Sequence, residues 1–226
     1  MLARVEEAFR SEQALTICER DPKPTKNHSK TEPQVQKDTA FPLPPDLPRP
    51  VDDGAAAHLR GMAMPRLSLP STAGGSVDLS ALRAPRTVIY CYPMTGVPGK
   101  PLPEGWDMIP GARGCTPQSC GFRDHHAELA ELQAEVFGFS TQTTAYQKEM
   151  SERLHLPFEV LSDAKFELCD ALRLPTFEVE GTRLVRRLTL IVRNGRIEHV
   201  FYPVFPPNES ADEVLRWLSA HPLAGH

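Results

Sequence analysis

Two cysteines five residues apart are the residues of this chain best suited to chemistry. Cys115 and Cys120 belong to a segment that reads GCTPQSCGFRD over residues 114–124. Pro117 suits the first turn of a helix, where its missing N–H costs nothing, and Thr116 before it is an acceptable N-cap. Apolar residues then recur at helical spacing, so we expect a helix over about residues 116–135. Cys115 would lie just ahead of its first turn.

The start of a helix favours a reactive cysteine. The exposed N–H groups and positive end of the helix stabilise an anion, and the thiolate rather than the thiol is the nucleophile. In an intact helix, a residue five positions on is displaced by about 7.5 Å along the axis and by about 140° around it. A disulfide needs Cα atoms about 4.4–6.8 Å apart. The two sulfurs could therefore join only if the first turn unwinds, which suits a catalytic thiol with a resolving partner better than a permanent disulfide.

The cysteine pair also has two less reactive interpretations, and both stay open. Free cysteines are among the most buried residue types, so both could be small apolar side chains of the core. Metal binding is the second alternative, since His125 and His126 follow Cys120, but this spacing does not match the usual zinc motifs. We expect neither a bound metal nor another cofactor.

The bulk composition excludes several classes of function. The chain has 226 residues, a net charge of -4, 40% hydrophobic and 24% charged residues. It shows no basic footprint for nucleic acid and no apolar run of about 18 residues for a membrane span. The first ten residues carry charges where a signal peptide has its apolar core, and the 5 scattered cysteines do not form a secreted disulfide framework. We expect a cytoplasmic protein that binds neither nucleic acid nor membrane.

Composition also divides the chain near residue 60. Residues 21–60 contain proline-rich runs with polar residues between them and little to bury. We therefore expect residues 1–60 to be a poorly ordered N-terminal extension with a proline-rich linker. Residues 61–226 are expected to form one folded domain.

Within that domain, strands alternate with helices. Strands buried on both faces are expected at 87–92 and 136–140, with a short strand at 158–163. β-Hairpins are expected at 65–79 and at 188–201, the second with Asn194-Gly195 at its turn. Further helices are expected at 143–155, at 164–173 and from Asn208 or Ser210 onward. The order predicts an α/β fold with a mixed central β-sheet flanked by helices and an N-terminal β-hairpin.

The segment 94–111 fits no regular element, because it is rich in glycine and proline. Loops of this length are usually functional or disordered. Trp106, Met108 and Ile109 indicate that this one is packed.

Several short motifs, in their order and spacing, resemble those of the peroxiredoxins, and within them the Q type, also called bacterioferritin comigratory protein. The resemblance covers about residues 61–226. The motifs that carry it are Tyr92-Pro93, Gly114-Cys115-Thr116 with Cys120, Phe122-Arg123-Asp124, Arg187-Leu188-Thr189 and residues 197–201.

The resemblance implies a thioredoxin-like fold and a thiol-dependent peroxidase. Cys115 would reduce hydrogen peroxide or an organic hydroperoxide and become a sulfenic acid, which Cys120 would resolve as an intramolecular disulfide. Thioredoxin or a similar dithiol would recycle the enzyme. Arg187 matches the family arginine that holds the thiolate and the peroxide. We expect a monomer or a homodimer. The alternative is a thioredoxin-like redox sensor or disulfide-exchange module without efficient peroxide turnover.

An insertion separates this chain from the family pattern Pro-x-x-x-Thr-x-x-Cys. Pro93 lies 22 residues before Cys115 instead of seven, an insertion of 15, and Ala112 stands in the place of the threonine. Thr95 is our hypothesis for the displaced threonine, with Thr116 as the alternative. Gln118 stands where relatives often have glutamate, which we interpret as a minor change.

Overall fold

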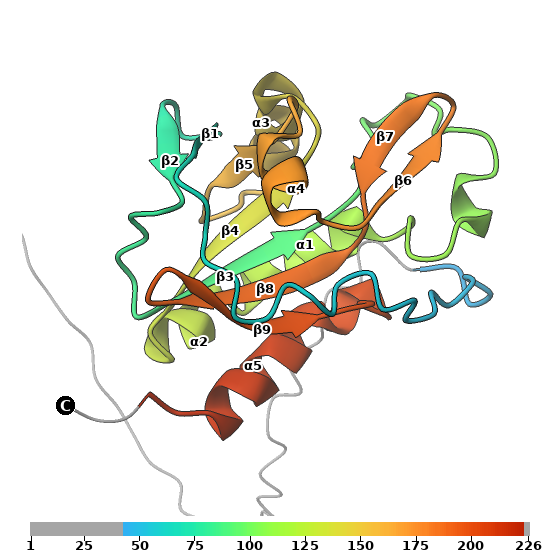
Figure 1. The fold of residues 1–226 in the computed structure, drawn as a ribbon. Coiled ribbons are helices and arrows are strands. Elements are labelled where there is room, and N and C mark those ends of the chain that lie inside the picture. The colour runs from blue at the N-terminus through green and yellow to red at the C-terminus, as the bar shows by residue number, and fades with distance from the viewer. Residues whose placement is uncertain (1–42, 224–226) are drawn as a thin grey trace, which may run out of the picture. The chain divides into compact units, whose positions relative to one another are not determined.

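Five strands form the central sheet of the protein, in the order β5-β4-β3-β8-β9 (Figure 1). The computed structural model describes residues 43–223, so residues 1–42 of the expected N-terminal extension lie outside the described residues. The sheet strands are β3 (Arg86–Cys91), β4 (Ala134–Ser140), β5 (Val160–Ser162), β8 (Leu188–Arg193) and β9 (Arg196–Phe201). Because β3, β4 and β5 run parallel while β8 and β9 are antiparallel to their neighbours, the sheet is mixed, as predicted.

Among residues 43–223, two further hairpins stand outside this sheet. The predicted N-terminal hairpin pairs β1 (Ser68–Pro70) with β2 (Ser76–Asp78). A second hairpin, which we did not predict, pairs β6 (Thr176–Val179) with β7 (Thr182–Val185). The turn between β8 and β9 is the predicted one, since Asn194 and Gly195 have φ of 51° and 70°.

Five α-helices and two short 3₁₀ helices lie within the described residues. They are α1 (Cys115–Asp124), α2 (His126–Glu131), α3 (Thr144–Arg153), α4 (Glu167–Leu172), α5 (Ser210–Ala220), η1 (Trp106–Met108) and η2 (Pro207–Glu209). The expectation of a single helix over 116–135 is therefore wrong, because two helices, α1 and α2, occupy this segment. The chain leaves the helical region at His125, with φ -99° and ψ 11°, and the ring of His125 lies 3.4 Å from the carboxylate of Asp212 on α5. None of these helices is long and apolar enough to cross a membrane.

The core is divided between the two faces of the sheet. Along β3, Val88 and Tyr90 join the apolar cluster that contains residues of α1, α2 and α5. Their neighbour Ile89 faces the other way, as alternation along a strand requires, and joins the cluster that contains α4. Leu59, just before the expected domain boundary, is fully buried in that second cluster. The boundary at residue 61 stays a prediction.

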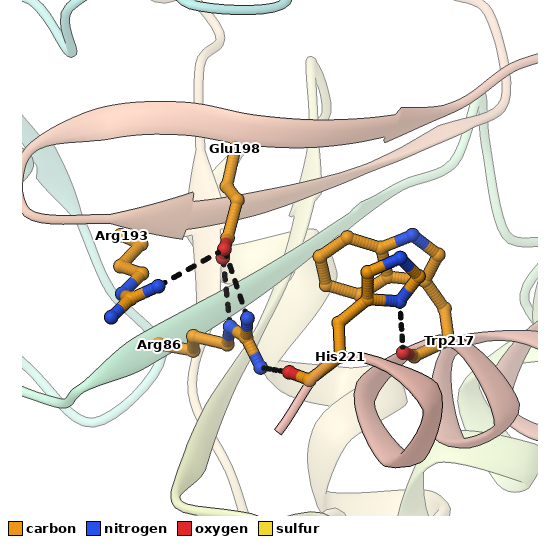
Figure 2. A network of polar contacts seen from close by, with 5 residues as sticks. All are labelled: Arg86, Arg193, Glu198, Trp217 and His221. Carbon is orange, nitrogen blue, oxygen red and sulfur yellow. Dashed lines mark hydrogen bonds and ion pairs between the residues drawn. The ribbon is translucent and has the colours of Figure 1, made fainter. Parts of the chain in front are cut away.

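A network of polar and aromatic contacts ties the end of α5 to the sheet (Figure 2). Buried Arg86 at the start of β3 donates to both carboxylate oxygens of Glu198 on β9, at 2.7 and 2.9 Å. It also donates to the carbonyl of His221, at 2.6 Å, and its guanidinium lies 5.1 Å from the ring centre of Trp217. Arg193 donates to Glu198 from the neighbouring strand. These contacts fix the C-terminal end of α5. At the other end of α5, its first residue, Ser210, accepts a hydrogen bond from Gln118 of α1, the helix that carries Cys115.

Candidate active site

Cys115 is the first residue of α1, one position earlier than the sequence predicts. The N-cap is Gly114 and not Thr116. Gly114 has φ of 99°, and a side chain there would clash with Pro207 of η2, so this position requires glycine. The first N–H groups of a helix have no partner within it, and Pro117 contributes none. The N–H groups of Cys115 and Thr116 therefore make the positive end of α1 at the buried sulfur.

Arg187 holds its guanidinium against that sulfur. Its Nη2 lies 3.1 Å from Cys115 Sγ and donates to it. The same nitrogen donates to the carbonyls of Ala112 and Arg113, at 3.1 Å each, and Nε donates to the carbonyl of Gly111 at 3.2 Å. The side chain is only 3% exposed. A buried positive charge is thus fixed beside the candidate nucleophile, where it stabilises negative charge on sulfur.

Gln118 is a site residue whose importance the sequence did not reveal. It is fully buried on α1, its Oε1 accepts from Nη1 of Arg187, and its Nε2 donates to Ser210 Oγ at 3.3 Å. Its spacing from Cys115 could have revealed that Gln118 lies near the sulfur. Residues three apart on a helix lie on the same face, and Gln118 follows Cys115 by three. A neutral amide orients the guanidinium without neutralising its charge.

A pocket of about 500 Å³ opens on Cys115. Its apolar walls come from the inserted segment, through Met94, Val97, Leu102 and Trp106, and from Leu43. Three basic side chains also line it, at Lys100, Arg113 and Arg153. The volume is in the range of small-molecule sites.

Thr95 and Cys115 line this same pocket. Both the N–H and the hydroxyl of Thr95 donate to Gln142 Oε1, at 3.0 and 3.2 Å, and the carbonyl of Thr95 accepts from Gln142 Nε2 at 3.2 Å. Thr95 is therefore held by both ends of one amide. Pro93 is buried where β3 ends.

The inserted segment is anchored by Trp106, which is 3% exposed. Its ring lies 6.3 Å from that of Phe177 on β6, and it joins Ala112 and Leu184 in a separate apolar cluster. The expectation that Trp106 packs is confirmed, and that for Met108 is wrong, because Met108 is 72% exposed. The η1 turn directs one of these side chains inward and the other outward.

Cys120 lies on the same intact helix as Cys115, and both are free thiols. It is partly buried, and this burial raises the pKa of the Cys120 thiol, an effect that Arg123 opposes. Cys91 and Cys169 are fully buried, and burial raises the pKa of both thiols strongly. These two are core residues, as expected. Within residues 43–223 no group of side chains has the make-up of a metal site.

Comparison with known proteins places this geometry in a family. The Redoxin family matches residues 59–215. The peroxiredoxin Bcp of Escherichia coli (strain K12) is 30% identical over 170 residues, which cover 71% of this chain and 96% of that protein. The chloroplastic peroxiredoxin Q of Oryza sativa subsp. japonica is 29% identical over 161 residues, covering 71% of this chain and 67% of the relative. The crystal structure of peroxidoxin BcpB from Mycobacterium tuberculosis superposes with a TM-score of 0.58 at 25% identity, over 71% of this chain and 96% of that one.

The Redoxin match includes all the strands described above, helices α1 to α4 and the cysteine segment. Peroxiredoxins are thiol-dependent peroxidases, which reduce a peroxide with a thiol reductant. The chain therefore belongs to the Redoxin family and is a peroxiredoxin of the Q type, a thiol-dependent peroxidase with a thioredoxin-like fold.

Proposed function

We propose that Cys115 is the peroxidatic cysteine of this enzyme and that Cys120 resolves it. The observation that carries the proposal is the contact of 3.1 Å between Nη2 of Arg187 and Cys115 Sγ, at the positive end of α1 and at the pocket. Of the four cysteines in residues 43–223, Cys115 alone accepts a hydrogen bond from an arginine. That environment favours a nucleophilic thiolate.

In the first step the thiolate attacks the nearer oxygen of the hydroperoxide. An S–O bond forms, the O–O bond breaks, and the outer oxygen leaves as an alkoxide or hydroxide that takes up a proton. Arg187 and the N–H groups of Cys115 and Thr116 stabilise the charge that develops on the oxygens. The products are a Cys115 sulfenic acid and an alcohol or water.

Thr95 and Pro93 support this step in the proposal. With its hydrogen directed to Gln142, the hydroxyl oxygen of Thr95 keeps lone pairs that can accept a hydrogen bond from the O–H of the peroxide. Pro93 closes the end of β3 and excludes water from that side. Thr95→Ala should therefore lower the rate of peroxide attack; an unchanged rate would pass the role to Thr116.

In the second step the sulfur of Cys120 attacks the sulfenic sulfur and releases water. The helix separates the two residues while it is wound, so α1 must open first. The contacts that open are those of Ser119 with Tyr90 and of Gln118 with Ser210. Burial disfavours the thiolate of Cys120 in the wound helix, and opening removes that restraint.

The pocket supports a substrate range that includes organic hydroperoxides beside hydrogen peroxide. A pocket lined by both apolar and basic side chains can accommodate an alkyl chain as well as a small polar oxidant. We propose thioredoxin or a similar dithiol as the reductant, which returns both cysteines to thiols by exchange. The cytoplasm, where such dithiols are kept reduced, is the proposed location.

Stopped-flow kinetics with hydrogen peroxide and cumene hydroperoxide test the proposal. Cys115→Ser should abolish peroxide reduction, whereas Cys120→Ser should still form a sulfenic acid, detectable by mass spectrometry, and proceed to the sulfinic acid in excess peroxide. Cys18→Ser, which also removes one thiol, is the matched control and should behave as the parent chain. Full activity in Cys115→Ser would refute the assignment. Oxidation without repeated turnover in the presence of thioredoxin would favour the redox-sensor alternative.

A further inference from the structure

We propose that Trp106 is a positioning residue for Arg187. In this inference, which rests on the role of Arg187 in the proposed function, Trp106 seats the inserted segment so that the carbonyls of residues 111–113 hold the guanidinium against Cys115. Nothing in the family pattern supplies this device, because the pattern has no insertion before the cysteine.

The acceptors around Arg187 come mostly from one short stretch of backbone. Three of its partners are successive carbonyls, those of Gly111, Ala112 and Arg113, at 3.1–3.2 Å. The others are Gln118 Oε1 and Cys115 Sγ. Since most of the guanidinium donors go to one short stretch of backbone, the direction of the guanidinium depends on where that stretch lies.

The backbone of residues 111–113 is held in place by a hydrogen bond and by a buried side chain. Residues 111–113 belong to no helix or strand, and Gly111 has φ of 78°. The N–H of Ala112 donates to the carbonyl of Ile109 at 3.1 Å, and the methyl group of Ala112 is fully buried in the cluster with Trp106 and Leu184. Thus the residue that stands in the place of the family threonine uses its side chain as an anchor and its carbonyl as an acceptor.

Trp106 is the largest buried side chain of this cluster. Trp106 packs against Phe177 of β6 and Leu184 of β7. The inserted segment is therefore held in place by its packing on the β6–β7 hairpin. The segment and this hairpin lie side by side in Figure 1. Removing the indole would free Ala112 to shift, and the carbonyls that aim Arg187 would shift with it. A displacement of about 1 Å in positioned groups can cost on the order of 100-fold in rate.

The experiment compares Trp106→Ala with Met108→Ala in the full chain. Both variants truncate a large apolar residue of the same η1 turn, but Met108 points to solvent. We expect the second-order rate constant with hydrogen peroxide to fall about tenfold or more in Trp106→Ala, judged from the cost of about 10²–10³ of losing one positioned donor outright. The pH–rate profile should also move to higher pH, because the thiolate loses its cationic partner. Met108→Ala should match the parent in both measurements, and Trp106→Phe should restore most of the rate.

Trp106 also lines the pocket, so a direct effect on substrate must be distinguished. Loss of rate confined to cumene hydroperoxide, with hydrogen peroxide unaffected, would make Trp106 a substrate wall and overturn the inference. In the background of Arg187→Lys, Trp106→Ala should add little, since neighbours that act through one group are not additive. Independent, multiplying losses would overturn it as well.

The same series separates this inference from the proposed function. A rate loss in Arg187→Lys without one in Trp106→Ala overturns only the positioning role. An unchanged rate in Arg187→Lys overturns both the positioning role and the proposed part of Arg187 in the reaction. Circular dichroism and thermal melting check that each variant is folded. If Trp106→Ala does not fold, Trp106→Leu keeps apolar bulk without the ring and carries the same expected results.

Discussion

Removing the hydroxyl group of Tyr90, which lies against α1, should accelerate formation of the disulfide between Cys115 and Cys120. Tyr90 on β3 donates from Oη to Ser119 Oγ at 3.2 Å, and both residues are fully buried. This bond exists only while α1 is wound. Tyr90→Phe deletes it and leaves Ser119 buried without that partner, yet it keeps the stacking of the ring on Phe122 at 4.4 Å. The substitution therefore destabilises the wound helix relative to the open one.

The size of the effect follows from the cost of a lost buried hydrogen bond. That cost is about 1–2 kcal/mol, which corresponds to about 5–30-fold in an equilibrium. Formation of the disulfide between Cys115 and Cys120 should accelerate by up to this factor. The first attack on peroxide should be unchanged, because the contact of Arg187 with Cys115 is untouched. Less sulfenic acid should then survive to become sulfinic acid.

Single-turnover experiments measure both steps. One equivalent of hydrogen peroxide is mixed with the protein, the reaction is quenched at intervals with a thiol-blocking reagent, and mass spectrometry counts sulfenic acid, disulfide and sulfinic acid. Thr87→Val is the matched control, because it removes a buried hydroxyl of the same strand that has no hydrogen-bond partner among residues 43–223. A disulfide rate in Tyr90→Phe equal to that of Thr87→Val, or slower, would refute the idea that this bond restrains α1.

Three other predictions concern stability. Leu59→Ala should lower the free energy of unfolding by about 2–5 kcal/mol, measured with urea, because Leu59 is a fully buried core residue ahead of the expected domain boundary. Gly114→Ala should lower the melting temperature and slow peroxide attack together, since φ of 99° and Pro207 both oppose a side chain there; Gly195→Ala, with open space at a turn, should lower the melting temperature without slowing attack. The free energy of unfolding should fall as the pH drops below about 6.5. Burial lowers the pKa of His199 in the folded state, so the unfolded chain binds more protons in this pH range. The charged and titratable groups near this ring are Arg60, His221 and Glu198. A second loss of stability should begin below about pH 4.5, because the hydrogen bond from Arg86 lowers the pKa of Glu198 in the folded state. Urea midpoints measured against pH check both losses, and in His199→Phe only the loss below about pH 6.5 should disappear.

Much of the central sheet could be predicted because the sequence patterns that specify its strands and turns lie within the strands and turns themselves. The apolar run at β3 and the Asn194-Gly195 turn each determine their own structure, and both agree with the fold. The β6–β7 hairpin has a weaker signal. Thr182 and Arg183 of β7 are exposed, and both strands pair only with each other, so their apolar pattern is incomplete.

The boundaries of α1 depend on contacts that no local pattern contains. Pro117 correctly predicts a helix start nearby, but the helix begins at Cys115, one position before the expected start, because Gly114 takes a left-handed conformation against Pro207. At the other end, His125 turns the chain toward Asp212 of α5. Both partners lie far along the chain from the helix, so spacing within the segment could not reveal them.

For Arg187 too, the sequence predicted the residue and its chemical role but not the groups that surround it. A cation beside Cys115 could be inferred from what a thiolate requires, and Arg187 could be named from the family motif. What could not be inferred is that its other partners among residues 43–223 are all neutral: three carbonyls and the amide of Gln118. A buried charge is costly unless it is paired. Among these hydrogen-bond partners, the sulfur of Cys115 is the one group that can take a negative charge and pair with the buried guanidinium of Arg187.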